Sequence, residues 1–520
     1  MARPRLTPRQ KLARALEALH DVLGSDRGVV RGQQLTNANR VLLLESGYLR
    51  EILKGWYFVS DPTAEQGDTT PFFANFWEYL AHYLGERFGA GYCLTAEHSL
   101  LRHAQYTVIP KTVNVVLQTN QSQVQELAFG HTVAMFPGKS TFPTAAQTVD
   151  IHGLRCMNIP LCLVNLPPRH FTAYSREVQI VMSQLQDPGA LAALANINRT
   201  GLARILSAYR QANRSDFADA VLQQLAGLNI HPRTDESPFD ATPVYTLGQP
   251  GRSPLYARVR ALWEQHRESV AACRPASAMI DVSPADYLAR VQAIRTEDAY
   301  HSLSIERYRV TPELIRKVAE EGWDPIHDAT DQKQVAAMAA KGYLDAFEWV
   351  RDAAVQVYEH RTIDPGLAAQ LFTAQHQAWY QKLFRPSVDA GILDVTDLVG
   401  YRRHMVFLRG SLHAPPRHEY VLDGMEALRE CLASETDAFV RAVLGHWLLG
   451  FVHPYMDGNG RIARFTMNVL LAAGGYPWTV IRVDDREAYM RALESASVDD
   501  DLSAFANFIS AQVVRAASVG

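Results

Sequence analysis

The chain has 520 residues, a formal net charge of −4 and 20% charged residues. At about 100–200 residues per domain, this length predicts roughly three domains. The charge excludes a protein that coats a polyanion with its whole surface, so contact with nucleic acid would need a local basic face. Five scattered cysteines without a Cys-x-x-Cys pair favour neither a disulfide framework nor a zinc site, and they predict a reducing, cytoplasmic location. No secretory signal and no membrane span are predicted.

Residues 1–62 are predicted to form a winged helix-turn-helix domain. Apolar residues lie on one helical face over 7–23, a short segment follows at 29–35, a helix begins after Thr36, and two strands are expected within 48–59 around Lys54-Gly55. Residues 1–60 carry ten basic side chains against five acidic ones, a local charge of +5, which indicates contact with a DNA backbone. The alternative is a winged domain that binds protein. The residues counted are Arg3, Arg5, Arg9, Lys11, Arg14, Arg27, Arg31, Arg40, Arg50 and Lys54 against Glu17, Asp21, Asp26, Glu45 and Glu51.

Residues 63–230 are predicted to form a mixed α/β domain. Helical patterns cover 72–88 and 190–228, and a strand-like pattern covers 107–117. The segments 94–103 and 108–117, together with the winged segment, resemble the antitoxin-type regulators of abortive-infection operons. That resemblance implies a module like a transcriptional regulator. Residues 231–254, rich in Pro, Gly, Ser and Asp, are the expected linker.

Residues 255–520 are predicted to be helical to the end, with one strand-like interruption at 403–408 that is expected to form a β-hairpin closing at Pro415-Pro416. The fold class predicted for the chain is therefore multidomain and mainly α. It joins a winged helix-turn-helix, a mixed α/β middle domain and an all-α C-terminal domain with one hairpin.

The segment 453–464, His-Pro-Tyr-Met-Asp-Gly-Asn-Gly-Arg-Ile-Ala-Arg, is predicted to bind phosphate. Gly458 and Gly460 let main-chain N–H groups approach a ligand, and the helix expected to begin there favours an anion at its N-terminus. Arg461 and Arg464 are three residues apart, on one face of the first turn, and guanidinium groups suit phosphate oxygens.

Two further side chains of this segment suit catalysis on a phosphate. Asp457 offers an oxygen ligand for Mg²⁺, which proteins hold with one or two carboxylates plus substrate phosphates. His453 is expected to have a near-neutral pKa, as a general base requires.

The segment resembles the signature H-P-[FY]-x-[DE]-G-N-G-R-x-x-R of the Fic family of protein adenylyltransferases at every specified position. The resemblance covers about residues 280–515, with a core at about 365–515. It implies ATP as substrate, Mg²⁺, and transfer of AMP to a Ser, Thr or Tyr hydroxyl. Ser497 replaces an asparagine of some members, so adenine is not specified there.

The resemblance also implies a role for each matching residue. His453 would take the hydroxyl proton and Asp457 would hold Mg²⁺. Residues 399–416 look like the family's flap, the hairpin that aligns a target by strand addition. The residues implied to bind nucleotide are Gly458, Asn459, Gly460, Arg461, Arg464 and Tyr489, with Phe407, Leu408, Arg409 and Gly410 of the flap.

Residues 301–307, His-Ser-Leu-Ser-Ile-Glu-Arg, resemble the family's inhibitory motif [ST]-x-x-x-E-[GN] through Ser302 and Glu306. The resemblance implies that Glu306 pairs with Arg464 and occupies the guanidinium that should receive the γ-phosphate. Arg307 stands where the motif has glycine or asparagine. The alternative is an exposed Glu–Arg pair on a helix face.

Other functions stay open at this point. Fic-fold kinases replace the second glycine by lysine, and Gly460 argues against that chemistry. Transfer of another nucleotide, such as UMP, is an alternative, and so is a DNA-binding regulator whose C-terminal domain senses nucleotide. The expected partners are a target protein that presents a hydroxyl at the flap, DNA through residues 1–60, and a second copy of the chain; no membrane is expected.

Overall fold

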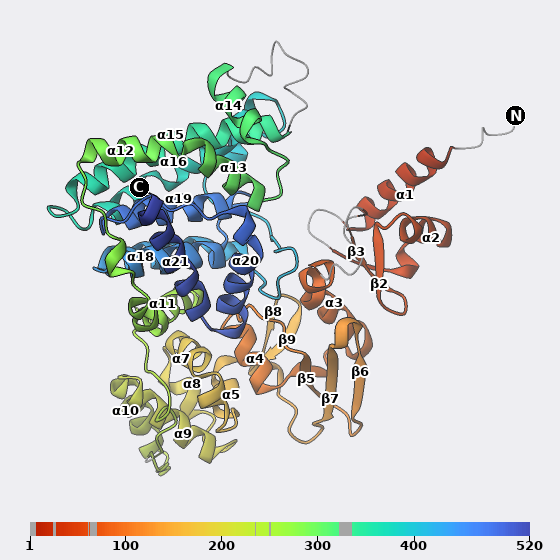
Figure 1. Cartoon of the computed structure of the whole chain (residues 1–520). Coiled ribbons are helices and arrows are strands. Elements are labelled where there is room, and N and C mark those ends of the chain that lie inside the picture. The colour runs from red at the N-terminus through yellow and green to blue at the C-terminus, as the bar shows by residue number, and fades with distance from the viewer. Residues whose placement is uncertain are drawn as a thin grey trace, which may run out of the picture. The chain divides into compact units, whose positions relative to one another are not determined.

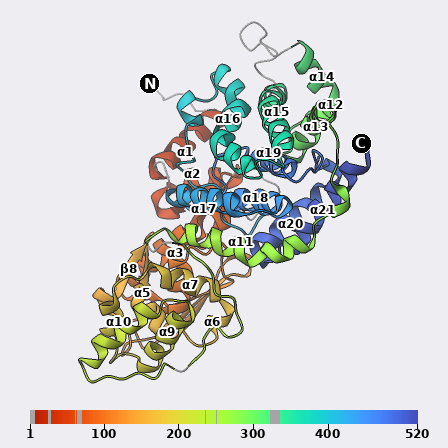
Figure 2. The same cartoon turned by 90° about the vertical axis from the view of Figure 1, so that its left-hand side faces the viewer.

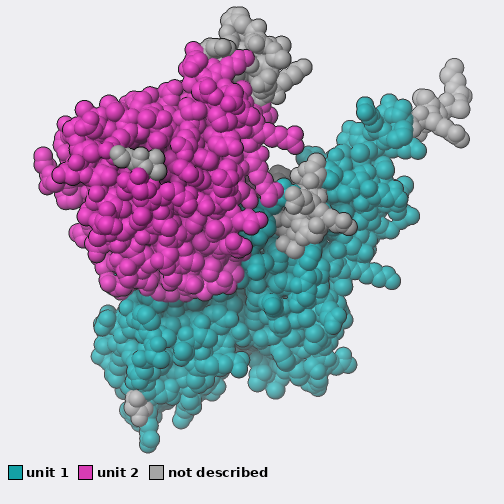
Figure 3. Space-filling model, viewed as in Figure 1, with its two compact units in different colours: residues 1–254, 406–414 teal, residues 255–405, 415–520 magenta. Residues whose placement is uncertain are grey.

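A computed structural model describes residues 7–23, 28–60, 62, 70–234, 236–248, 251–321 and 335–519. It divides into two compact units, residues 1–254 with 406–414, and residues 255–405 with 415–520 (Figure 3). Several expectations fall partly outside the described residues: the boundary at 62–63, part of the 231–254 linker, and the charges of Arg3, Arg5, Asp26 and Arg27. No helix within the described ranges is long and apolar enough to cross a membrane.

The first unit begins with a small sheet and two helices around a core of their own. The elements are α1 (Pro8–Leu23), β1 (Val29–Arg31), α2 (Asn37–Glu45), β2 (Leu49–Leu53) and β3 (Trp56–Val59), with strand order β1-β3-β2. The Thr36 hydroxyl caps α2 by accepting from the Asn39 N–H. The expected strand pair is present, and the short segment at 29–35 holds β1 and a three-residue 3₁₀ turn, Gly32–Gln34. The winged helix-turn-helix assignment stays a prediction.

The rest of the first unit mixes helices and strands (Figure 1). A four-stranded sheet has the order β4-β5-β7-β6, with β5 and β7 parallel, and β8 pairs with β9. The expected strand at 107–117 begins only at Thr112, after Pro110, which has no N–H to donate to a sheet. The elements are α3 (Thr70–Phe88), β4 (Tyr92–Leu94), α4 (Ala96–His103), β5 (Thr112–Leu117), β6 (Gln123–Glu126), β7 (Thr132–Pro137), β8 (Thr148–Ile151), β9 (Leu154–Met157), α5 (Ile159–Val164), α6 (His170–Ala173), α7 (Ser175–Gln184), α8 (Pro188–Ala192), α9 (Arg199–Gln211) and α10 (Ser215–Ala226).

The second unit is helical, so the prediction of a mainly α chain is confirmed (Figures 1 and 2). The stretch expected as one helix over 284–303 is two helices that meet at Ile294, with φ −91° and ψ 0° there. The helices are α11 (Pro254–Ala272), α12 (Pro284–Ala293), α13 (Arg295–Ile305), α14 (Pro312–Glu321), α15 (Val335–His360), α16 (Leu367–Asp389), α17 (Val421–Ser434), α18 (Ala438–Val452), α19 (Asn459–Ala472), α20 (Arg486–Glu494) and α21 (Ser503–Val519).

Helix α19 is the centre of this unit. It packs against α15, α16 and α18, and nearly all of its side chains are buried, as expected for a helix that is apolar on most faces. Gly342 of α15 permits the neighbouring α16 to come close, because a Cβ there would collide with the Leu383 carbonyl. The start of α19 is therefore held by three neighbouring helices.

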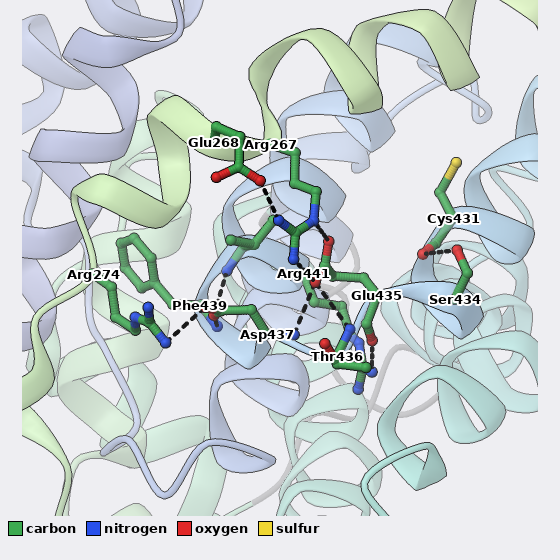
Figure 4. Close-up of polar contacts among 11 residues, drawn as sticks. Arg267, Glu268, Arg274, Cys431, Ser434, Glu435, Thr436, Asp437, Phe439 and Arg441 are labelled. Atoms are coloured by element: carbon green, nitrogen blue, oxygen red, sulfur yellow. Dashed lines mark hydrogen bonds and ion pairs between the residues drawn. The ribbon is translucent and has the colours of Figure 1, made fainter. Parts of the chain in front are cut away.

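Helix α18 is anchored at its N-terminus by a polar network (Figure 4). Asp437 caps the helix by accepting from the Phe439 and Val440 N–H groups at 2.9 and 3.2 Å. Glu435 receives two hydrogen bonds from Arg267 of α11, at 2.8 and 3.1 Å, and its carbonyl accepts from Arg441. At its other end, α18 stops at Val452, directly before His453.

The predicted β-hairpin at 403–408 is wrong. Residues 400–416 contain no β-strand, and their one bridge joins His413 to Val108 of the first unit. A tight turn is present, with the Ser411 N–H donating to the Leu408 carbonyl at 3.2 Å and Gly410 at φ +74°. No strand pairing joins residues 403–408 to the returning arm, whose bridge is to Val108.

Candidate nucleotide site

His453 follows α18 in a left-handed conformation, φ 52° and ψ 61°, which is uncommon for a residue with a side chain. Its Nδ1 lies 3.2 Å from the Gly450 carbonyl. Since a carbonyl only accepts, Nδ1 carries the hydrogen and Nε2 keeps a lone pair. Burial lowers the pKa of His453 to about 4, so the expected near-neutral pKa is wrong. At neutral pH the imidazole is therefore uncharged and able to accept a proton.

The turn between His453 and α19 is fixed by its own side chains. The Asn459 amide accepts from the Tyr455 N–H and donates to the Tyr455 carbonyl, both at 2.9 Å. The Tyr455 ring stacks on Tyr380 with centroids 3.9 Å apart. Asn459 thus locks the turn with its side chain.

The start of α19 combines two glycines with two buried arginines. Gly458 has φ +78°, and a Cβ there would lie 2.8 Å from the Phe384 ring. Arg461 and Arg464 are 1% and 5% exposed. Arg461 Nε and Arg464 Nη1 have no hydrogen-bond partner among the residues that the structure describes. Buried cationic donors at a helix N-terminus fit phosphate oxygens.

Asp457 is the carboxylate of this turn, and its side chain is 57% exposed. Oδ1 accepts from the Gly458 N–H at 2.6 Å, and Oδ2 lies 3.2 Å from Arg461 Nη2. The described residues contain no group of three or more His, Cys, Asp or Glu that could hold a metal by themselves. A single carboxylate fits Mg²⁺ when substrate phosphates and water complete the octahedron.

Helix α13 presents Ser302 and Glu306 to Arg464. Arg464 Nε donates to Ser302 Oγ at 2.9 Å, and Nη2 donates to the Ser302 carbonyl at 3.1 Å and to Glu306 Oε1 at 2.8 Å. A Cβ on Gly460 would collide with the Glu306 carboxylate, so this carboxylate lies directly on the glycine turn. The expected Glu306–Arg464 ion pair is present.

The opposite charges of Glu306 and Arg464 keep both groups ionised despite their burial. Burial raises the pKa of Glu306, but the charges of Arg464 and Arg461 outweigh it, and the pKa ends below its usual value. For Arg464, burial lowers the pKa and Glu306 raises it by more, so the net direction is upward. Both groups are charged at neutral pH.

Five further residues were expected to bind nucleotide, and their role stays a prediction. Tyr489 is 1% exposed, and its hydroxyl lies 2.7 Å from His446 Nε2. Phe407, Leu408, Arg409 and Gly410 belong to the first compact unit, whereas residues 453–464 belong to the second.

Two residues at the site escaped the sequence analysis. The Tyr308 hydroxyl lies 3.4 Å from both Asp457 Oδ2 and Arg461 Nη2, and its ring faces the Arg461 guanidinium at 5.2 Å. Arg402, 5% exposed, donates from Nε to the His453 carbonyl at 2.7 Å. The position of Tyr308 two residues after Glu306 was the available signal, and Arg402 had none.

Comparisons with known proteins agree with this geometry. Residues 368–471 match the family described as Fic/DOC family. The protein adenylyltransferase Fic of Nematostella vectensis is 29% identical over 234 residues, 44% of this chain and 49% of that protein. Its counterpart in Drosophila willistoni is 34% identical over 113 residues, 21% of this chain and 22% of that protein. The chain thus spans less than half the length of either relative.

Two solved structures are also similar. Fic-1 from C. elegans is 18% identical, with a TM-score of 0.34 over 68% of this chain and 90% of that chain. A Fic domain containing signaling protein from Bacteroides thetaiotaomicron is 16% identical, with a TM-score of 0.32 over 50% and 95%. On the family match, the C-terminal part of this chain contains a Fic domain.

Proposed function

We propose that the Fic domain of this chain transfers AMP from ATP to a Ser, Thr or Tyr hydroxyl of a target protein or of the chain itself. The observation that carries the proposal is the pairing of a neutral base with an anion site over one short turn. His453 offers the Nε2 lone pair, and eight residues later Arg461 begins the buried cationic face of α19. Two relatives are named protein adenylyltransferase, and that name describes the reaction proposed here.

Each chemical step has a residue to serve it. His453 Nε2 takes the proton of the target hydroxyl, whose oxygen attacks the α-phosphorus. The bond from that phosphorus to the oxygen of the β-phosphate breaks, and pyrophosphate leaves with the electron pair. Arg461 and Arg464 hold the phosphates by charge-assisted hydrogen bonds. Asp457 would hold Mg²⁺, which when bound neutralises phosphate charge.

We propose further that Glu306 inhibits this reaction. Its carboxylate occupies one donor of Arg464 and lies against Gly460, where a phosphate would approach. Ser302 takes two more hydrogen bonds from the same guanidinium, so three acceptors of α13 hold Arg464. A negative carboxylate in this place repels the γ-phosphate and competes for its partner.

Labelled ATP tests the reaction and distinguishes it from kinase chemistry. The Glu306→Gly protein should incorporate label from ATP marked at the α-phosphate and none from ATP marked at the γ-phosphate. His453→Ala in the same background should incorporate neither. Label from the γ-phosphate, or no label at all, would contradict the proposal. Label from UTP marked at the α-phosphate, with none from ATP marked in the same way, would replace AMP by UMP as the transferred group.

DNA binding by residues 1–60 stays a second proposal, supported by the +5 charge of that segment. Two of its basic residues already have partners within the chain. Arg31 pairs with Glu86 at 2.7 Å, and Arg40 donates to the Gly32 carbonyl at 3.2 Å. Binding that weakens steeply with salt would support it. The proposed cytoplasmic location has the five free cysteines in its favour, and a homodimer is also kept as a proposal.

The division into domains 1–62, 63–230, 231–254 and 255–520 is likewise kept as a proposal. The division between the two compact units at Pro254 and Leu255 supports its last boundary.

A further inference from the structure

Residues 406–414 carry the tip of the flap, the segment expected to align a protein target. They fold with the N-terminal unit and not with the Fic domain that surrounds them in sequence (Figure 3). The segment 399–416 therefore leaves one compact unit, joins the other and returns. The contacts that hold this segment determine whether a target strand can pair with it.

The ends of the flap are held in the Fic domain by Arg402. Its guanidinium donates to the His404 carbonyl at 3.0 Å on one side of the flap and to the Pro416 carbonyl on the other. It also donates to the His453 carbonyl at 2.7 Å, and its main-chain N–H donates to the Pro454 carbonyl at 2.8 Å. The base of the flap is thus bonded to the main chain of the proposed catalytic residue.

The returning arm of the flap pairs with the main chain of the N-terminal unit. His413 and Val108 form an antiparallel bridge, and the Ala414 N–H donates to the Thr107 carbonyl at 2.9 Å. Thr107 and His413 are 6% and 2% exposed. This is the kind of contact that an added strand makes with a sheet edge.

The opposite edge of the same arm is also occupied. Because successive residues of an extended segment point their N–H groups to opposite sides, the His413 N–H points away from Thr107. It donates to Ser411 Oγ at 3.0 Å. At 413–414 the arm therefore uses one edge for the N-terminal unit and the other for its own turn.

The tip of the flap lies beside α3. Phe407 and Leu408 line one small cavity, of about 10 Å³, together with Phe73 and Ala74 of α3. The shared cavity and the main-chain pairing thus involve two separate parts of the N-terminal unit.

We propose that the N-terminal unit is a clamp for the flap: Thr107–Val108 and α3 bind residues 406–414 and keep this arm from accepting a target strand. A target that docks by strand addition must displace the Thr107 contact. The clamp is separate from Glu306, which acts on Arg464. The binding of residues 406–414 by the N-terminal unit does not depend on the proposed function. The effect of that binding on labelling rests on the proposed AMP transfer.

Hydrogen–deuterium exchange tests the binding part in the full-length chain. Ala414→Pro removes the N–H that donates to Thr107, and Ala414→Val is the matched control that keeps it. Ala74→Glu disturbs the other side of the contact on a half-buried helix position. In Ala414→Pro and Ala74→Glu, the amides of residues 408–413 should exchange about five- to tenfold faster, as expected for the loss of a hydrogen bond or of local packing. Unchanged exchange in both variants would overturn the clamp.

Labelling tests the consequence in the Glu306→Gly background, with α-labelled ATP and a synthetic peptide that contains serine, threonine and tyrosine as acceptor. Adding Ala414→Pro should raise labelling of the peptide about threefold or more, and adding Ala414→Val should not. Equal peptide labelling with and without Ala414→Pro would refute the control of target access. If Glu306→Gly labels nothing, the proposed AMP transfer fails, while the exchange result still decides whether the flap is clamped.

Discussion

Glu306 Oε1 and Arg464 Nη2 lie 2.8 Å apart, although the two residues are separated by 158 positions in the chain. The glutamate directly follows α13, and the arginine lies in the second turn of α19. The same guanidinium donates to Ser302, so α13 and the proposed phosphate site share one cation. A ligand that needs Nη2 of Arg464 must displace Glu306, whereas Nη1 has no hydrogen-bond partner among the described residues.

Replacing Glu306 by glutamine should release the arginine without changing the size of the side chain. A charged acceptor gives a hydrogen bond roughly twice as strong as a neutral one, so the amide competes less well with a phosphate. We expect ATP to bind about tenfold more tightly, as measured by calorimetry. Glu313→Gln is the control, because that glutamate is exposed and pairs with Arg316 on α14. Equal affinities in all three proteins would show that Glu306 does not restrict nucleotide binding.

Arg307 should also affect the strength of inhibition. It follows the end of α13 with φ +66°, the left-handed position where glycine or asparagine is favoured. The inhibitory motif has those residues there, and this chain places an arginine, at a cost of about 1–2 kcal/mol. We expect Arg307→Gly to raise the free energy of unfolding by up to about 1 kcal/mol and to lower residual labelling. Thermal unfolding measures the change in the free energy of unfolding. Arg307→Ala is the control, because alanine keeps the backbone strain. A rise in the free energy of unfolding in both variants would argue against strain.

The helical frame was predictable because its signals are local. Helix α19 was expected over 460–473 and runs from Asn459 to Ala472, since the glycine turn and the apolar pattern mark it within a few residues. The break at Ile294 was missed because neither glycine nor proline marks it. The flap was misjudged because its strand partner is Val108, about 300 positions away.

In the site as well, residues with a local sequence signal were predictable and residues placed by distant contacts were not. The residues of 453–464 come together because one turn carries them, and Glu306 was indicated by its motif. Arg402 reaches the site only through tertiary packing, so its contact with His453 has no local sign. Tyr308 is marked only by its position two residues after Glu306, and its contact with Asp457 also depends on tertiary packing. Tyr489 matched the family by position, yet its hydroxyl is bonded to His446 in the core.

The pH dependence of labelling should be flat through the neutral range. Burial lowers the pKa of His453 to about 4, so the base is already neutral above pH 5.5. The pKa of Glu306 is also lowered, so the ion pair is complete above the usual carboxyl range and is lost only as the pH falls through that lowered pKa. We expect initial labelling rates of wild type and Glu306→Gly to vary less than about twofold between pH 5.5 and 7.5. An inflection near pH 6.5 would show that His453 titrates as a free imidazole.

The Tyr308 hydroxyl should compete with a cation for the Asp457 carboxylate, as Glu306 should compete with a phosphate for Arg464. Its hydroxyl lies 3.4 Å from Asp457 Oδ2 and from Arg461 Nη2, so a cation at Asp457 has to compete with it. Tyr308→Phe removes the hydroxyl and keeps the ring over the guanidinium. In the Glu306→Gly background we expect the Mg²⁺ concentration for half-maximal labelling to fall about two- to fivefold, which corresponds to a hydrogen bond of about 0.5–1 kcal/mol. Tyr300→Phe on α13 serves as the control, and an unchanged Mg²⁺ requirement in Tyr308→Phe would mean that the hydroxyl does not compete with the cation.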